Sequence, residues 1–147
     1  FIQKSGEYIF DGGGKRMRPA LLLLCARLLD RDGEEEVTYA AVVELIHTAT
    51  LIHDDIIDHS ALRRGRKTIN ELWGNNLTVL LGDWLYTTAM KMALRHGSVA
   101  ILDRLCDATL RMTEGEIAEA MGCSIGSVRT HVARAYKALA IRLGDLR

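Results

Sequence analysis

The chain has 147 residues, of which 48% are hydrophobic and 26% are charged, and its 19 basic and 19 acidic residues balance. This length suits one domain, or one domain with a small appended module, and the composition excludes a disordered or fibrous protein. Three distant cysteines without a Cys-x-x-Cys pair argue against a zinc cluster or a disulfide framework and indicate a reducing cytoplasm. The apolar runs are too short or too interrupted to span a bilayer. Because the chain opens with Phe1 instead of methionine, we expect that its true beginning is missing.

All of the predicted elements are helices. Pro19 suits a first helical turn, and Thr38 is a plausible N-cap for a long helix with apolar residues at steps of three and four. Thr113 and Glu116 form a Thr-x-x-Glu capping box, and Ser124 caps the last helix. The predicted helices cover residues 19–29, 38–58, 76–96, 98–112, 113–121 and 124–143.

The stretch LIHDDIIDHSALRRG, at the end of the predicted long helix, carries three aspartates followed by two arginines. At 100° per residue, His47, Asp54 and Asp58 share one narrow face, and two carboxylates one turn apart can hold a Mg²⁺ ion whose other ligands are water and phosphate. Asp55 lies further round the helix, where it supports the site indirectly or faces solvent. The alternative is a solvated acidic helix end, which the negative C-terminal end of the helix dipole disfavours.

Two basic clusters accompany the aspartates. Arg63 and Arg64 follow them directly, and guanidinium groups there suit a polyanion, most simply diphosphate, that a metal neutralises from the other side. The segment GGGKRMRP adds Lys15, Arg16 and Arg18 on a glycine-rich turn that an anion can approach closely. This segment is not a P-loop, because Arg16 stands where serine or threonine should be and no strand precedes it. On its own, it would more often be a solvated loop.

Residues 1 to about 116 resemble the N-terminal part of a trans-polyprenyl diphosphate synthase. The resemblance is carried by GGKRMRP, ELIHTATLIHDDIID, RRG and LLGDWL, in the family's order and spacing. It implies a partial isoprenoid-synthase helical bundle that joins isopentenyl diphosphate to an allylic prenyl diphosphate. The residues implied to bind isopentenyl diphosphate are Lys15, Arg18, His47 and Arg64. Arg63 would bind the allylic diphosphate, and Asp54 and Asp58 would hold Mg²⁺ as the first aspartate-rich motif.

Two further features bear on the expected activity. Ala49 and Thr50 are small where family members with short products tend to carry aromatic residues, which suggests a long product of the octaprenyl class; the alternative is that they permit close helix packing. A full synthase is more than twice this length, and no DD pair occurs after Asp55, so the second aspartate-rich motif is missing. We expect the chain to be inactive alone and active only if a separate, complementing chain supplies the missing helices; as partners we expect a homo-oligomer or such a chain.

The tail follows a different pattern. Residues 113–147 resemble region 4 of bacterial sigma factors, a helix-turn-helix, and response-regulator DNA-binding domains look similar. From Ile117 onward the tail carries five basic and two acidic residues, so it is +3 and the rest of the chain is −3. Its inner face would be Ile117, Ala118, Met121, Val128 and Val132, and its DNA-facing residues would be Ser127, Arg129, Thr130, Arg134 and Lys137. The alternative is an amphipathic helical hairpin with a solvated basic face.

The sequence thus predicts a truncated synthase-like domain over residues 1–116 and a helix-turn-helix segment over 117–147. Four functions remain open: a prenyltransferase segment, a DNA-binding regulator with the synthase part as scaffold or sensor, a composite without an evolved joint function, and an HD-type metal phosphohydrolase suggested by His53 and Asp54. The last lacks further ligands and leaves both arginine clusters unexplained, so it ranks below the others.

Overall fold

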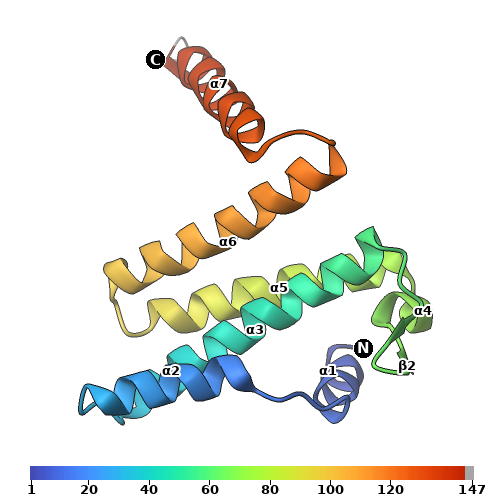
Figure 1. The fold of residues 1–147 in the computed structure, drawn as a ribbon, viewed down its shortest axis with the longest axis vertical. Coiled ribbons are helices and arrows are strands. Elements are labelled where there is room, and N and C mark those ends of the chain that lie inside the picture. The colour runs from blue at the N-terminus through green and yellow to red at the C-terminus, as the bar shows by residue number, and fades with distance from the viewer. Residues whose placement is uncertain (145–147) are drawn as a thin grey trace. The chain divides into compact units, whose positions relative to one another are not determined.

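The computed structural model describes residues 1–144, with side chains up to residue 141. Residues 145–147 lie outside the described part, as do the side chains of Arg142 and Arg147, two of the five cations in the predicted basic tail. The chain divides into two compact units between Ser98 and Val99. Both units consist almost entirely of helices, so the predicted all-α class is confirmed (Figure 1).

The first unit, Phe1–Ser98, combines helices with one small antiparallel hairpin (Figure 1). Its elements are α1 Ile2–Asp11, α2 Met17–Leu28, α3 Glu34–Ile57, β1 Leu62–Arg63, β2 Arg66–Lys67, α4 Ile69–Trp73 and α5 Asn75–Leu94. Helix α3 packs along both α2 and α5. The helices predicted over 19–29 and 76–96 are present as α2 and α5, whereas α1, α4 and the hairpin were not expected.

Helix α3 begins one turn earlier than predicted. Its N-cap is Gly33, whose N–H donates to the Glu36 carboxylate at 2.9 Å. Glu34, Glu35 and Glu36 occupy the first turn, where negative charge is stabilised by the positive end of the helix dipole. The predicted cap at Thr38 is therefore wrong, and its hydroxyl instead donates to the Glu34 carbonyl inside the helix at 2.8 Å.

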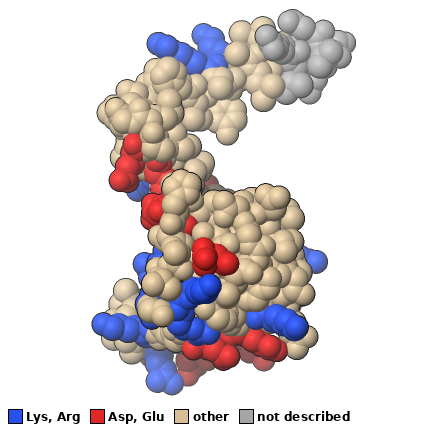
Figure 2. Space-filling model, turned by 90° about the vertical axis from the view of Figure 1, so that its right-hand side faces the viewer, with Lys and Arg blue, Asp and Glu red and all other residues tan. Residues whose placement is uncertain are grey.

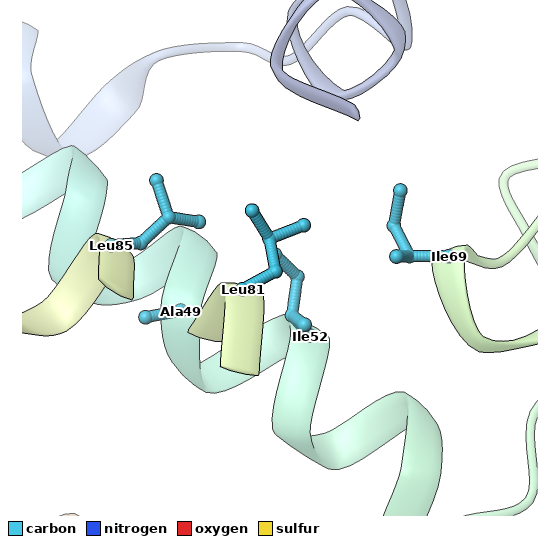
Figure 3. Close-up of a cluster of buried hydrophobic side chains, with 5 residues drawn as sticks. All are labelled: Ala49, Ile52, Ile69, Leu81 and Leu85. Carbon is cyan, nitrogen blue, oxygen red and sulfur yellow. The ribbon is translucent and has the colours of Figure 1, made fainter. Parts of the chain in front are cut away.

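The core of the first unit lies where α3, α4 and α5 meet. Five buried side chains form it, as Figure 3 shows: Ala49, Ile52, Ile69, Leu81 and Leu85. Tyr8 and Ile9 of α1 pack against this cluster, and Trp73 meets the Tyr8 ring edge-on with a centroid distance of 5.8 Å. Helix α1 is thereby held beside the end of α3 that carries the aspartates.

The second unit is a helical hairpin of α6 Val99–Ala120 and α7 Ile125–Gly144 (Figure 1). The predicted N-cap at Ser124 is confirmed, because its side-chain oxygen accepts the Ser127 N–H at 3.1 Å. The predicted helix start at Thr113 is wrong, since α6 continues through it and the Thr113 hydroxyl donates to the Thr109 carbonyl. The boundary predicted at residue 116 stays a prediction. Among residues 1–144, none of the helices combines the length and hydropathy that a membrane-spanning helix needs.

Candidate functional site

An open cleft of about 660 Å³ lies in the first unit between α1, the glycine-rich turn, α3 and the hairpin. Its cationic lining residues are Lys15, Arg16, Arg18, Arg63, Arg64, Arg66 and Lys67, whereas its acidic ones are Glu44 and Asp55. Both of these carboxylates are already paired with an arginine. Figure 2 shows basic and acidic side chains together at the surface of this unit. The cleft therefore holds a surplus of positive charge, which favours an anionic ligand.

The glycine-rich turn forms one wall of the cleft. Gly13 has a φ of 68°, a left-handed conformation that glycine adopts without steric cost, and the chain then enters α2 at Arg16. The Arg16 guanidinium donates to the Glu44 carboxylate of α3 at 2.6 Å. This pair fixes the turn against α3, and Lys15 and Arg18 line the cleft on either side of it with exposed side chains.

The hairpin forms the opposite wall. Its turn residues Arg64 and Gly65 have φ angles of 54° and 77°, as a tight two-residue hairpin loop requires. Arg63 donates from Nε and Nη2 to the buried Asp55 carboxylate at 2.9 and 2.8 Å. Arg64 donates from Nη1 to the Gly13 carbonyl at 2.7 Å. The hairpin is thus tied to α3 and to the glycine-rich turn, with both arginines at the cleft.

His47 lies on α3 and is half-buried in the cleft lining. Burial lowers the pKa of its imidazole, and the nearby positive charge of Arg18 lowers the pKa further, as do Arg63 and Arg64. The ring is therefore neutral at pH 7, with one nitrogen able to donate a hydrogen bond and the other able to accept one. An anion bound among these cations would raise this pKa and favour the imidazolium form.

The three aspartates of the α3 end occupy different surroundings. Asp54 is half-buried and Asp58 is exposed, and neither lines the cleft, whereas Asp55 is 5% exposed and does. Asp55 is therefore the buried partner of Arg63. The predicted alternative, in which Asp55 faces solvent, is wrong. Burial raises the pKa of Asp54, and the negative charge of Asp58 adds to the rise. The negative charges of Asp54 and Asp58, one turn apart on α3, therefore oppose each other.

Comparison with known proteins assigns the chain to a family. Residues 1–140 match the family described as polyprenyl synthetase. The chain belongs to the polyprenyl synthetase family. The octaprenyl diphosphate synthase of Escherichia coli K12 is 45% identical over 120 residues, which cover 82% of this chain and 37% of that protein. The chain therefore spans little more than a third of this relative's length.

Solved structures with this fold include two bacterial synthases. A decaprenyl diphosphate synthase from Rhodobacter capsulatus matches with a TM-score of 0.79 and 41% sequence identity. The matched part covers 82% of this chain and 37% of that synthase. A polyprenyl synthase from Caulobacter crescentus CB15, complexed with calcium and isoprenyl diphosphate, has a TM-score of 0.75 and 40% identity. The matched part covers 78% of this chain and 35% of the Caulobacter crescentus synthase.

The family match also extends over residues 113–140, the segment that resembles sigma region 4, and that resemblance finds no support. The expected inner face is only partly buried. Ala118 and Val128 are buried, whereas Met121 is 64% exposed and Val132 is 40% exposed, because α7 packs only near its beginning. Ile117 is also exposed, at 39%.

The five predicted DNA-facing residues all lie on α7. Arg129 donates to the Glu114 carboxylate at 2.8 Å, and the Thr130 hydroxyl donates to the Gly126 carbonyl of its own helix. Ser127 is half-buried, whereas Arg134 and Lys137 are exposed. Binding of DNA by this face stays a prediction.

The two small residues before the aspartates differ in position. Ala49 is 2% exposed in the core cluster, packed among side chains that include Leu81 and Leu85 of α5. Thr50 is half-buried and donates its hydroxyl to the His47 carbonyl at 2.8 Å. The position of Ala49 favours the alternative interpretation, in which a small side chain permits close packing of two helices.

Several residues that line the cleft were missed, Tyr8 and Arg66 among them. Tyr8 and Arg66 line it together, and the Arg66 guanidinium lies over the Tyr8 ring, 4.1 Å from its centroid. Arg66 could have been found from the run RRGRK, since residues flanking a tight hairpin turn lie close in space. Tyr8 had no such signal, because α1 was not predicted.

Proposed function

We propose that this chain provides the diphosphate-binding part of a prenyltransferase that joins isopentenyl diphosphate to an allylic prenyl diphosphate. The observation that carries the proposal is the cleft itself, in which cations from the glycine-rich turn and the hairpin converge with a neutral histidine on α3. Diphosphate is small, strongly anionic and able to accept several charge-assisted hydrogen bonds at once, so it suits such a lining.

The residue roles follow from the family resemblance and from their positions. Lys15, Arg18, His47 and Arg64 would hold isopentenyl diphosphate, and all four line the cleft. Arg63 would bind the allylic diphosphate. Its guanidinium still has donors left after pairing with Asp55 through Nε and Nη2, since arginine carries five.

The α3 end fits a divalent cation. Asp54 and Asp58 would hold Mg²⁺, and binding would relieve the repulsion between them, which adds to the effect of burial in raising the pKa of Asp54. Among the described residues, no three or more His, Cys, Asp or Glu side chains form a group that could hold a metal ion. Two carboxylates can suffice for Mg²⁺, which usually keeps waters and takes substrate phosphates beside one or two carboxylates. When bound, Mg²⁺ would stabilise the leaving diphosphate as an electrophile.

The chain's own residues then have defined tasks. Arg63 and the aspartates would orient the allylic diphosphate at the α3 end, and the remaining cations would hold the second diphosphate in the cleft. Two bound diphosphates in fixed positions would bring the allylic carbon and the isopentenyl double bond together, which lowers the entropic cost of their reaction. The reaction forms a carbon–carbon bond, releases diphosphate and removes a proton.

We further propose that the chain does not complete this reaction by itself. It spans 37% of the E. coli relative, and the second aspartate-rich motif of the family has no counterpart in its sequence. A separate, complementing chain would have to supply the remaining ligands and the rest of the prenyl cavity. The names of the similar octaprenyl and decaprenyl diphosphate synthases favour a long product.

The test is isothermal titration of the purified chain with a non-hydrolysable allylic diphosphate analogue, in Mg²⁺ and in EDTA. We expect saturable binding that needs Mg²⁺ and that weakens in Asp54→Asn and Asp58→Asn. Asp103→Asn is the matched control, because this exposed aspartate lies on α6 outside the cleft lining. A monodisperse, helical sample that shows no saturable binding would overturn the proposal.

A further inference from the structure

Arg66 is held at the cleft by an aromatic residue from a distant part of the sequence. Its guanidinium carbon lies 4.1 Å from the centroid of the Tyr8 ring, the geometry of a cation–π contact. The Tyr8 hydroxyl donates to the Lys67 carbonyl at 2.8 Å. The side chain of Tyr8 therefore joins helix α1 to strand β2 by two contacts, one of which is with Arg66.

The guanidinium of Arg66 has no acceptor among residues 1–141, whose side chains the structure describes. Within the described part of the chain, it forms neither a hydrogen bond nor an ion pair, although Arg16 and Arg63 in the same cleft pair with Glu44 and Asp55. Arg66 is also half-buried, so water reaches it only in part. A partly desolvated group with five donors favours an anion that can accept from it.

The position of Arg66 fits such an anion. Its Nη1 lies close over the glycine-rich turn, where a Cβ atom added at Gly12 would come within 3.2 Å of it. The absence of a side chain at Gly12 leaves room for this approach. Lys15 and Arg64 line the same cleft from the turn and from the hairpin. Arg66 is thus placed among the cations to which the proposed function assigns diphosphate binding.

We propose that Arg66 is an additional diphosphate ligand of this cleft and that Tyr8 is the residue that positions it. The proposal rests on the function proposed above and extends it to two residues outside the family motifs. The flat guanidinium would stack on the Tyr8 ring and offer its edge to a phosphate oxygen, a geometry that a lysine ammonium does not reproduce. Tyr8 would act through Arg66 and would not touch the ligand.

The test measures the affinity for isopentenyl diphosphate by isothermal titration at several salt concentrations. Arg66→Gln should weaken binding about tenfold, because it removes a hydrogen bond to a charged group, and it should also make the affinity less dependent on salt. Arg66→Lys should lie between Arg66→Gln and the unaltered chain. Arg95→Gln, at an exposed position outside the cleft lining, is the matched control.

Variants of Tyr8 distinguish a role in positioning Arg66 from a general role in stabilising the fold. Tyr8→Phe keeps the ring below Arg66 and loses only the hydroxyl, so we expect affinity close to that of the unaltered chain. Tyr8→Leu removes the ring and should weaken binding about fivefold, the loss expected for a cation–π contact. In an Arg66→Gln background, Tyr8→Leu should have no further effect. A purely structural role of Tyr8 would instead weaken binding equally in both backgrounds.

The outcomes separate this inference from the proposed function. If Arg66→Gln binds as tightly as the unaltered chain while Arg64→Gln binds more weakly, the role of Arg66 is refuted and the proposed function stands. If the unaltered chain, folded by circular dichroism, does not bind isopentenyl diphosphate, both fall together. The stated losses in Arg66→Gln and Tyr8→Leu, with unchanged Arg95→Gln, would support the inference.

Discussion

Replacement of Asp55 by asparagine tests the ion pair that ties the hairpin to α3. The Asp55 side chain is 7% exposed and that of Arg63 is 38% exposed, and two guanidinium N–H groups reach the same carboxylate oxygen. Breaking a fully buried pair costs about 3–5 kcal/mol, whereas an exposed pair contributes about 0–1 kcal/mol. This half-buried pair lies between these limits, at about 2–3 kcal/mol.

An opposing effect reduces this loss. Asp55 lies in the last turns of α3 near Asp54 and Asp58, so removal of its charge relieves repulsion and an unfavourable dipole interaction worth about 0.5 kcal/mol. We therefore expect Asp55→Asn to lower the free energy of unfolding by about 2 kcal/mol. Urea unfolding followed by circular dichroism measures this change, and an unaltered m-value would show that the folded state keeps its compactness.

Asp103→Asn is the control for Asp55→Asn, since Asp103 is exposed on α6 and has no ion pair among the described residues. It should change the free energy of unfolding by no more than about 0.5 kcal/mol. The reasoning is refuted if Asp55→Asn unfolds at the same urea concentration as the unaltered chain. It is also refuted if Asp55→Asn and Arg63→Gln prove additive, because two partners in one pair must couple.

Three further predictions concern α3. Because the folded-state pKa of His47 lies below its ordinary value of 6.5, the unfolded chain binds more protons there, and stability should fall as pH drops through 6.5. His47→Gln should remove this dependence in urea unfolding at pH values on either side of 6.5. The raised pKa of Asp54 means that its ionisation opposes folding, so Asp54→Asn should melt at or above the unaltered chain at pH 7. Added Mg²⁺ should raise the melting temperature of the unaltered chain alone, and an equal rise in Asp54→Asn would contradict the metal assignment. Ala49→Phe should lower the free energy of unfolding by about 1–3 kcal/mol through overpacking, whereas Thr50→Phe should have a smaller effect; equal losses would contradict the packing account.

The long helices of the first unit were predictable because their apolar periodicity is strong. Helices α2 and α5 follow the sequence pattern closely, and the end of α3 lies next to the predicted Asp58. Both misplaced caps were threonines, Thr38 and Thr113. A threonine caps a helix only if the preceding chain is not helical, and here each threonine hydroxyl donates to a carbonyl four residues earlier inside a helix.

The motif residues of the site could be predicted from the sequence, whereas the contacts that hold them in place could not. The motif residues Lys15, Arg18, His47, Arg63 and Arg64 carry strong local signals, and the structure gathers them in one cleft. The contacts that fix their geometry join residues far apart in sequence, and no local pattern encodes such pairs. The hydrogen bond from Arg64 to the Gly13 carbonyl spans 51 positions, and that from Tyr8 to the Lys67 carbonyl spans 59.

The most direct test of the central claim compares two ligands that differ only in their charged group. Isothermal titration of the purified chain with isopentenyl diphosphate and with isopentenol shows whether the cleft recognises diphosphate. We predict saturable binding of the diphosphate that weakens as salt rises and is reduced at least tenfold in Arg64→Gln, and no measurable binding of the alcohol. Absence of diphosphate binding by a folded, monodisperse sample, or equal binding in Arg64→Gln, would contradict this account.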